Sequence, residues 1–414
     1  MALIPGSTIS IPGRASFPQR ASLILEPQGP PGPPGADGAD GASFPGQFHV
    51  DDFGAVSLPL GTDRDAAQVT IRTGNVTAFN AAIAAARAHP NGGQVTFGPG
   101  VYLTNNPIGL DVHADTNVNL VFQGTSQYDI IQSNNLSLPC IRFHTDSGNL
   151  RNLTMRDFTV RGGREGISLT WVAYSRFERI WFWGSANVGL QNHAGNGNVF
   201  AFCRFDESAQ GTSNGTEAEA AHFISCEDSV SHCNFGEYCG GLILNGGDMA
   251  VDNCLFHDCK YRGRDFHDYL AGVDVAIAAP FMNAIAASIV CWQGSASLSQ
   301  IRGNCIGRFI STFRAYELVI SGSRFQTDQG SNTFIGFINL VKSGGTECAL
   351  NVGSSTFVWT ANQTGGGYFI ADPDAYLHDS VIEAQLVVYT GSSITDLGIR
   401  GGFNNYANLR TFTR

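Results

Sequence analysis

The sequence predicts an all-β protein built as a parallel β-helix, a solenoid in which short strands stack coil upon coil. Three observations predict this fold: an apolar repeat with a period in the twenties, heavy use of glycine, and a shortage of charge. Glycine supplies 50 of the 414 residues, and only 14% of the residues are charged, against roughly 25% in an ordinary soluble domain. A helical bundle would use far more Glu, Lys and Leu, so the composition favours a turn-rich β protein.

The repeat reads apolar-x-x-(often Cys or Ser)-x-apolar. Its copies are Leu153–Phe158, Phe177–Phe182, Phe200–Phe205, Val230–Phe235, Val251–Phe256, a degenerate Ile301–Ile306, Ile320–Phe325, Val352–Phe357 and Leu377–Ile382. A unit of this length cannot bury its own apolar side and must stack on its neighbours. The spacing predicts about nine to eleven coils, with a protruding loop at 208–218, where one interval lengthens.

The Cys or Ser position of the repeat predicts a buried ladder of small side chains. Cys203, Cys233 and Cys254 share this position, and serines 323, 355 and 380 occupy it in later copies. Residues at one repeat position stack in a solenoid, and buried thiols behave as compact hydrophobes. Two alternatives remain open, a disulfide and a metal or redox site that includes His232 and His257. The chain has no Cys-x-x-Cys spacing, so we predict no metal.

Residues 29–43 predict a collagen-like stalk. They form five Gly-x-y triplets, with glycines at Gly29, Gly32, Gly35, Gly38 and Gly41. The axis of a collagen triple helix admits only glycine, whereas a flexible Gly/Pro linker has no reason to keep strict register. The sequence therefore predicts a homotrimer with parallel N-termini, held together mainly by the domain that follows the stalk.

Residues 77–89 predict an Ala-rich helix. Thr77 can serve as N-cap, and Phe79, Ile83 and Ala86 fall on one side of the helix. The stretch from Pro90 to residue 93 ends it. Two short strands are predicted next, at residues 94–97 and 101–104, separated by a Gly-Pro-Gly turn.

These elements resemble the opening of the pectate-lyase-like superfamily, in particular the branch found in bacteriophage tailspikes and related virion appendages. The resemblance rests on Asp52-Phe-Gly-Ala55, on the Ala-rich helix and on Gly92-Gly-Gln-Val-Thr-Phe-Gly-Pro-Gly-Val-Tyr102. It implies a right-handed parallel β-helix whose N-terminal end is capped by the helix. We expect the cap and first coils at residues 44–124, the β-helix body at 125–382, and a C-terminal cap or tip at 383–414.

Four carboxylates are candidate catalytic residues: Asp206, Glu227, Asp228 and Asp252. Asp206, Asp228 and Asp252 follow one another at 22 and 24 residues, about one coil apart, so they could face one groove as acid and base. Exposed solenoid turns carry Asp and Glu in any case. The Asn-Thr-Asp, Gly-His-Gly and Arg-x-Lys signatures of polygalacturonases are missing.

Three tryptophans are candidate glycan-binding residues: Trp171, Trp181 and Trp183. They lie in two adjacent coils, together with Tyr174 and Phe182, and aromatic faces stack well on sugar rings. The alternative is that these rings pack in the core or in a subunit interface.

The resemblance and the stalk together predict a structural spike of a bacteriophage virion, in the tail, baseplate or collar, that adheres to host surface glycans. Residues 1–28 would dock on a virion structural protein, and three identical weak sites would act through avidity. One rival is a polysaccharide depolymerase, either a glycosidase or a lyase, and another is a decoration spike with no receptor role. A bacterial pectinase-type enzyme is disfavoured by the stalk and by the lack of a signal peptide.

Charge and composition argue against other classes of protein. The chain has 24 Lys and Arg against 35 Asp and Glu and no basic stripe, so we expect no nucleic-acid partner. We expect no membrane insertion and no cofactor. The expected location is the virion surface, after synthesis in the host cytoplasm.

Overall fold

The computed structural model describes residues 46–62, 68–206, 219–236, 241–259, 288–305, 308–313, 315–327, 336–341, 349–359, 368–371, 380–390 and 393–403. The chain divides into two units, residues 1–44 and 45–414, and all described residues belong to the second. The expected docking peptide at 1–28, the stalk at 29–43 and the loop at 208–218 lie outside the described residues.

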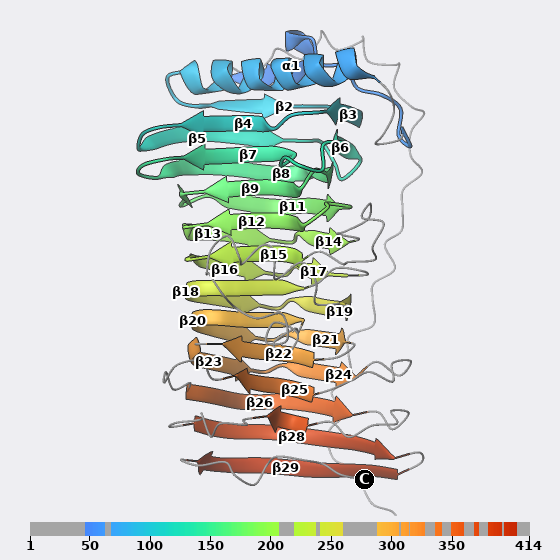
Figure 1. Ribbon diagram of the computed structural model, residues 1–414, viewed down its shortest axis with the longest axis vertical. Coiled ribbons are helices and arrows are strands. Elements are labelled where there is room, and N and C mark those ends of the chain that lie inside the picture. Colours follow the sequence, from blue (N-terminus) through green and yellow to red (C-terminus); the bar gives the residue numbers. More distant parts are fainter. Residues whose placement is uncertain are drawn as a thin grey trace, which may run out of the picture. The chain divides into compact units, whose positions relative to one another are not determined.

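The second unit is a parallel β-helix, whose coils follow one another in chain order along one axis (Figure 1). Each coil contributes to three sheets, which we number in the order in which the chain passes through them. Within the described residues, every pairing between strands is parallel except that of the last two. The predicted fold class is therefore confirmed.

The three sheets are made as follows. The first contains β1 (Gln47–His49), β2 (Gly93–Thr96), β5 (Thr116–Gln123), the starts of β8 (Leu150–Gly162) and β11 (Arg176–Trp183), β13 (Asn196–Ala201), β16 (Glu227–Ser231), the ends of β18 (Leu242–Asp252) and β20 (Ile289–Ser299), β23 (Ala315–Ser321), and the starts of β26 (Ala349–Trp359) and β28 (Ser380–Thr390). The second contains β3 (Gly100–Thr104), β6 (Asp129–Ser133), the ends of β8 and β11, β14 (Arg204–Asp206), β17 (Asn234–Phe235), β19 (Leu255–Cys259), β21 (Arg302–Cys305), β24 (Arg324–Thr327), and the ends of β26 and β28. The third contains β4 (Ile108–Val112), β7 (Ile141–Thr145), β9 (Glu165–Thr170), β12 (Val188–His193), β15 (Glu219–Ile224), the starts of β18 and β20, β22 (Arg308–Phe313), β25 (Gly336–Val341) and β27 (Tyr368–Ala371). The short β10 (Val172–Ala173) links the third and first sheets.

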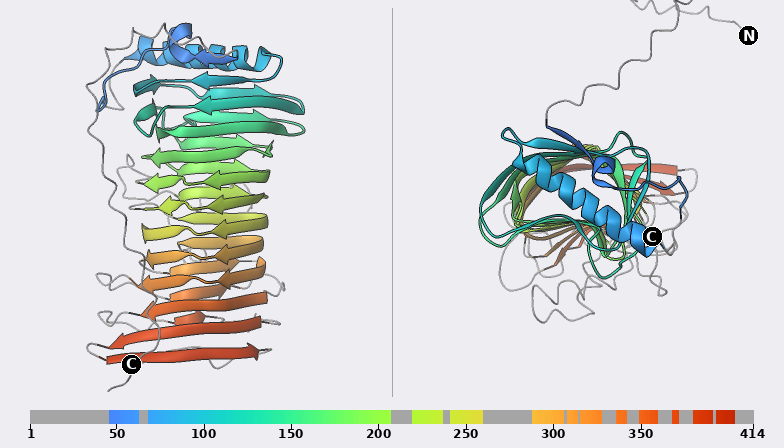
Figure 2. Two further views of the ribbon diagram at one scale, coloured as in Figure 1. Left: turned by 180° about the vertical axis from the view of Figure 1, so that it is seen from behind. Right: turned by 90° about the horizontal axis from the view of Figure 1, so that it is seen from above.

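The α-helix α1 (Val69–Ala88) lies across the N-terminal end of the stack (Figure 2), after the 3-10 turn η1 (Val50–Phe53). Its buried side includes Phe79, Ile83 and Ala86, as predicted. The ring of Phe79 packs edge-on against Phe97 and Tyr102, with centroids 5.5 and 5.3 Å apart. The helix therefore closes the apolar core of the first coil.

The predicted start of this helix at Thr77 is wrong, because the helix begins at Val69. Its first turns are rich in β-branched residues and contain a glycine, which are weak helix formers. Two buried side chains anchor these turns to β3: Arg72 Nη1 donates to the Thr104 carbonyl (2.9 Å), and Asn75 Nδ2 donates to the Leu103 carbonyl (3.0 Å). Tertiary contacts thus outweigh local propensity.

Phenylalanines that end the repeat form a stack inside the core. Phe182, Phe205, Phe235 and Phe256 lie ring on ring, with centroids 4.5, 4.9 and 4.5 Å apart and planes within 5° of parallel. In the next coil Gly303 takes this position. The ring of Phe309 fills the vacated space, and a Cβ on the glycine would collide with it.

The strand register differs from three predicted copies of the repeat. Phe158 pairs with Ile180, which occupies the Cys or Ser position, so the copy at Leu153–Phe158 does not end at the stacking position. Ile301 occupies the Cys or Ser position, since its neighbour Arg302 pairs with Leu255, so the degenerate copy ends at Gly303 and not at residue 306. At the C-terminal end, Ala384 pairs with Ser355, so Ser380 is not part of the ladder.

The stack ends in an antiparallel pair. β28 continues the parallel first and second sheets, whereas β29 (Ser393–Phe403) runs antiparallel to β28 along its whole length. The expected boundary between body and cap at residue 382 falls inside β28. Among the described residues, no helix combines the length and apolar character needed to cross a membrane.

Candidate functional site

Coils in the middle of the stack turn from the third sheet to the first through one or two sharp kinks, and we call this turn the double-kink corner after the coils at Trp171/Tyr174 and Ala194/Gly197. The kink residues have positive φ angles, which are uncommon for residues with bulky side chains. They are Trp171, Ala194 and Ser225 at the first kink and Asn152, Tyr174 and Gly197 at the second. This backbone places the rings of Trp171 and Tyr174 on the outside, where 44% and 60% of their surfaces are exposed.

A groove of about 520 Å³ runs along the outside of the double-kink corner, a volume typical of small-molecule sites. Besides the two aromatic rings, its lining includes the polar side chains of Asn149, Arg151, Asn196 and Glu227. Asn196 Nδ2 donates to Glu227 Oε2 (3.0 Å), and Arg151 forms an ion pair with Asp115 (3.4 Å). The groove thus joins aromatic surface to amide, guanidinium and carboxylate groups.

A ladder of polar side chains supports this corner from inside the coils. Leu153 N–H donates to Ser175 Oγ (3.0 Å), Ser175 N–H to Asn198 Oδ1 (3.0 Å), and Asn198 N–H to Asp228 Oδ1 (2.8 Å). Each side chain therefore accepts a hydrogen bond from the backbone of the coil before it, and the buried N–H groups of the corner are satisfied.

Asp228 is the charged end of this ladder. Asn192 Nδ2 donates to its second oxygen (2.6 Å), and a Cβ added to Gly195 would lie 2.5 Å from that oxygen. Burial raises the pKa of Asp228 to about 6. Because successive side chains of a strand point to opposite sides, Glu227 faces the groove while Asp228 faces inward, behind the backbone of Gly195.

The other two candidate carboxylates lie elsewhere on the coil. Asp206 is in β14 of the second sheet, where it accepts a hydrogen bond from Trp181 Nε1 (3.0 Å), forms an ion pair with Arg204, and has its pKa raised by burial. Asp252 ends β18 in the first sheet and accepts a hydrogen bond from Ser299. The structure brings Glu227 together with Trp171, but it does not gather the four carboxylates in one groove.

Trp181 and Trp183 lie on the second sheet, apart from Trp171. Their rings stack on each other, with centroids 5.5 Å apart and planes 11° from parallel. The Arg204 guanidinium lies 4.8 Å from the centroid of Trp181, and that of Arg161 lies 4.1 Å from that of Trp183. The ring faces are therefore already in contact with neighbours, unlike that of Trp171.

Between the first and second sheets each coil turns at one positive-φ residue, and we call this the single-kink corner. Its kink residues are Asp157, Arg179, Phe202, His232, Asn253, Gln300, Gly322 and Ser354. Cys203, Cys233 and Cys254 follow three of them as buried free thiols. Cys233 N–H donates to Cys254 Sγ (3.4 Å), and Cys254 Sγ donates to the Asp252 carbonyl (3.3 Å).

Several lining residues were not among the sequence candidates. Arg151 pairs with Ala173, which pairs with Asn196 in the next coil, so strand register alone brings the two polar side chains together. The repeat that we used to align the sequence covers only the single-kink corner. At the double-kink corner the turns differ in length from coil to coil, so the sequence does not show which residues lie opposite one another.

Comparisons with known proteins show the fold. No family model and no curated protein matches the chain. Among solved structures, a tailspike double mutant of E. coli bacteriophage HK620 in complex with pentasaccharide is similar, with a TM-score of 0.56 at 14% identity over 84% of this chain and 64% of that chain. DFA-IIIase from Arthrobacter chlorophenolicus A6 in complex with GF2 gives a TM-score of 0.56 at 10% identity, over 86% of this chain and 90% of that one. Alginate lyase from Paenibacillus sp. str. FPU-7 gives 0.52 at 9% identity, over 73% and 96%. The chain spans less than two thirds of the length of the tailspike that it matches.

Proposed function

We propose that the chain is a spike of a bacteriophage virion and that the groove at the double-kink corner binds a polysaccharide of the host surface. The observation that carries the proposal is the pair of exposed rings, Trp171 and Tyr174, beside the polar side chains of the groove. A sugar ring presents C–H groups on its face and hydroxyls around its edge. An aromatic ring with adjacent hydrogen-bonding groups complements both.

The similarity of fold to a tailspike solved with a pentasaccharide supports this proposal. We further propose that the chain acts as a homotrimer, with the Gly-x-y stalk at 29–43 joining three copies and residues 1–28 docking on the virion. Three grooves on one spike would bind a repetitive polysaccharide together, and weak individual sites would then suffice.

A second candidate function is cleavage of the polysaccharide in the same groove. The observation that favours it is the carboxyl group of Asp228, whose pKa of about 6 lets it hold a proton near neutral pH. Glu227 would supply the exposed carboxylate, and only the backbone around Gly195 separates Asp228 from the groove.

Binding is tested with the full chain over immobilised capsular and O-antigen polysaccharides from a panel of bacteria, by biosensor. The double variant Trp171→Ala, Tyr174→Ala should bind the recognised polysaccharide more than about tenfold more weakly, a loss of about 1.4 kcal/mol. Trp181→Ala is the matched control, because it removes an indole outside the groove and should leave the affinity unchanged. Equal losses in both variants, or no binding to any polysaccharide of the panel, would contradict the proposal.

Cleavage is tested on the recognised polysaccharide by following its chain length with size-exclusion chromatography. Binding without shortening supports adhesion. Shortening that Glu227→Gln abolishes supports hydrolysis in the groove, and shortening that this variant leaves unchanged excludes Glu227 as a catalytic residue.

A further inference from the structure

A second group of polar side chains lies on the outside of the third sheet, at the ends of β4 and β7. The sequence reads Asp111-Val-His113 at the end of β4 and His144-Thr-Asp146 at the end of β7. The two strands are paired in register, with Asp111 opposite His144 and Val112 opposite Thr145. Each histidine therefore faces an aspartate of the neighbouring coil.

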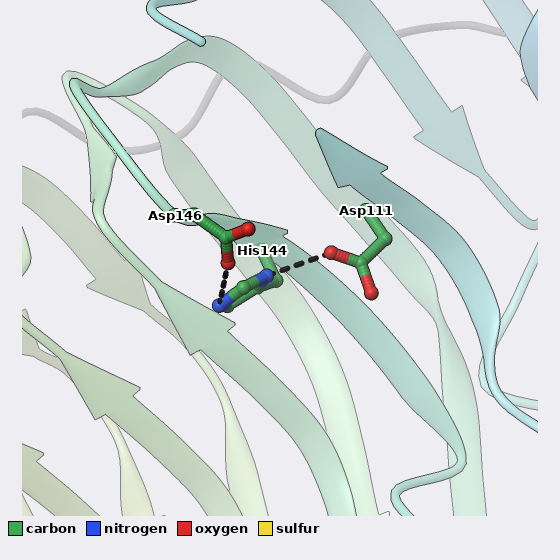
Figure 3. Close-up of side chains that lie close together, drawn as sticks. All are labelled: Asp111, His144 and Asp146. Atoms are coloured by element: carbon green, nitrogen blue, oxygen red, sulfur yellow. Dashed lines mark hydrogen bonds and ion pairs between the residues drawn. The ribbon is translucent and has the colours of Figure 1, made fainter. Parts of the chain in front are cut away.

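The contacts in this group are arranged symmetrically about His144, whose ring lies between two carboxylates (Figure 3). His144 Nδ1 lies 2.7 Å from Asp111 Oδ1, and Nε2 lies 3.3 Å from Asp146 Oδ1. The outer oxygens are held from the other side: Arg142 Nη2 lies 3.2 Å from Asp111 Oδ2, and His113 contacts Asp146 Oδ2.

A single N–H of the His144 ring cannot serve both carboxylates. A neutral imidazole carries a single N–H and can donate to only one carboxylate, yet both ring nitrogens face carboxylate oxygens. One carboxylate therefore faces a ring nitrogen that has no hydrogen to donate, and a metal ion would give that nitrogen and that carboxylate a common partner.

We propose that Asp111, His144 and Asp146 bind a divalent transition-metal ion of the Zn²⁺ type. Each residue offers one ligand atom, and these atoms lie within 4.8 Å of one another. Ligands about 2.0–2.2 Å from a tetrahedral zinc ion stand roughly 3.3–3.6 Å apart. Only one ring nitrogen of His144 can bind the ion, so the half-exposed carboxylate that faces the other nitrogen must turn toward the ion. A set with an imidazole donor suits Zn²⁺ better than Ca²⁺ or Mg²⁺, which prefer oxygen ligands.

His113 and Arg142 act as positioning residues in this site. Each fixes the outer oxygen of one carboxylate, and the inner oxygen is thereby directed toward the ring of His144. Partners of this kind commonly tune metal affinity by about tenfold or more. Because the ligands come from two successive coils, the ion would tie the first coil to the second next to the cap.

The test is isothermal titration of ZnCl₂ into the full, EDTA-treated chain. We expect one site per chain, a loss of affinity of more than about tenfold in His144→Ala and in Asp111→Asn, and a loss of about tenfold in His113→Ala. His232→Ala is the matched control, since it removes an exposed imidazole at the single-kink corner and should leave the affinity unchanged. Visible absorption of the Co²⁺-substituted chain provides an independent measure of imidazole and carboxylate ligation.

Three outcomes would overturn the proposal: no single zinc site in the wild-type chain, equal affinity in His144→Ala and wild type, or Ca²⁺ binding as tight as Zn²⁺. In the first two cases the cluster is a network of side-chain contacts without a metal ion. Circular dichroism verifies that the variants fold. If His144→Ala does not fold, Asp111→Asn alone decides, because its side chain is exposed and its loss leaves no buried group without a partner.

Discussion

The two corners of each coil turn the chain by the same local device and differ in what they hold inside and outside. At both corners residues with positive φ make the kinks, and in several coils a polar side chain inside the corner accepts an N–H of the preceding coil. At the single-kink corner the acceptor is a thiol or hydroxyl, as in Ser323 N–H to Ser355 Oγ (3.2 Å). At the double-kink corner the acceptor is the amide of Asn198 in one coil and the carboxylate of Asp228 in the next.

On the outside, the double-kink corner turns two large aromatic residues toward solvent beside a groove. At the single-kink corner the side chains that accept such a hydrogen bond are the small ones of Cys254, Ser323 and Ser355. The comparison therefore predicts that polar substitutions inside the double-kink corner have larger effects than those inside the single-kink corner.

The largest effect is expected for Asp228→Ala. It leaves the Asn198 N–H and the Asn192 amide without their partner, and buried unsatisfied groups should lower the free energy of unfolding by about 3 kcal/mol. Cys233→Ala at the other corner should cost only about 1 kcal/mol, since it removes a thiol that makes weak hydrogen bonds. Urea unfolding of both variants checks this difference, and equal losses would remove the distinction between the corners.

A smaller effect is expected for Gly195→Ala. The new Cβ would press on Asn192 and on Asp228 Oδ2 behind the groove and should cost about 2 kcal/mol. Gly353→Ala is the matched control, because a Cβ there meets nothing within 4 Å. Thermal unfolding should leave the control within about 0.5 kcal/mol of wild type. If Gly195→Ala were as stable as the wild type, the side chains of Asn192 and Asp228 behind the groove would be loosely packed.

The pH dependence of stability should change in Asp228→Asn. The folded-state pKa of Asp228 is about 6 against an ordinary value of 3.8. The protonated form thus contributes stability that is fully present below the ordinary value and is lost as the pH rises through 6. Removing the charge should reduce the loss between pH 4 and 7 by on the order of 1.5 kcal/mol, as measured by urea unfolding across this range. A slope in Asp228→Asn equal to that of the wild type would refute the assignment to Asp228.

The smallest effect is expected for Cys254→Ser. The hydroxyl can donate to the Asp252 carbonyl and accept from Cys233 N–H as the thiol does, and serine already holds this position in later coils. The cost should stay below about 1 kcal/mol in urea unfolding. Cys254→Val, which keeps the bulk but loses both hydrogen bonds, should cost about 2 kcal/mol. If the two variants were equally stable, the hydrogen bonds of the ladder would be unimportant there.

The repeat predicted the solenoid because one phenylalanine per coil must stack on the next, and it failed where a residue of another sheet fills the core. Gly303 breaks the repeat, and Phe309, which no local pattern connects to it, restores the packing. The start of α1 was missed for the same reason, since Arg72 and Asn75 find their partners on β3.

The candidate site was predictable only in part. Trp171 and Glu227 were singled out by type and line the groove, but Asp206 lies in the second sheet and Asp252 lies at the other end of the first. A repeat with a period in the twenties predicts how many coils there are. It does not predict in which sheet or turn a given residue lies, because the turns differ in length. The pairing of Asp-x-His with His-x-Asp, 33 residues apart from Asp111 to His144, needs the strand register to be seen.

The helix α1 also has a consequence for the association of whole molecules. The first coil of a solenoid ends in a row of free N–H and C=O groups, the kind of edge onto which another chain can add a strand. In this protein side chains of the helix occupy that row: Arg72 and Asn75 bind carbonyls of β3, and Asn80 Oδ1 accepts the N–H of Gly109 in β4. A helix laid over such an edge is one of the devices by which β-rich proteins avoid adding strands from a second molecule.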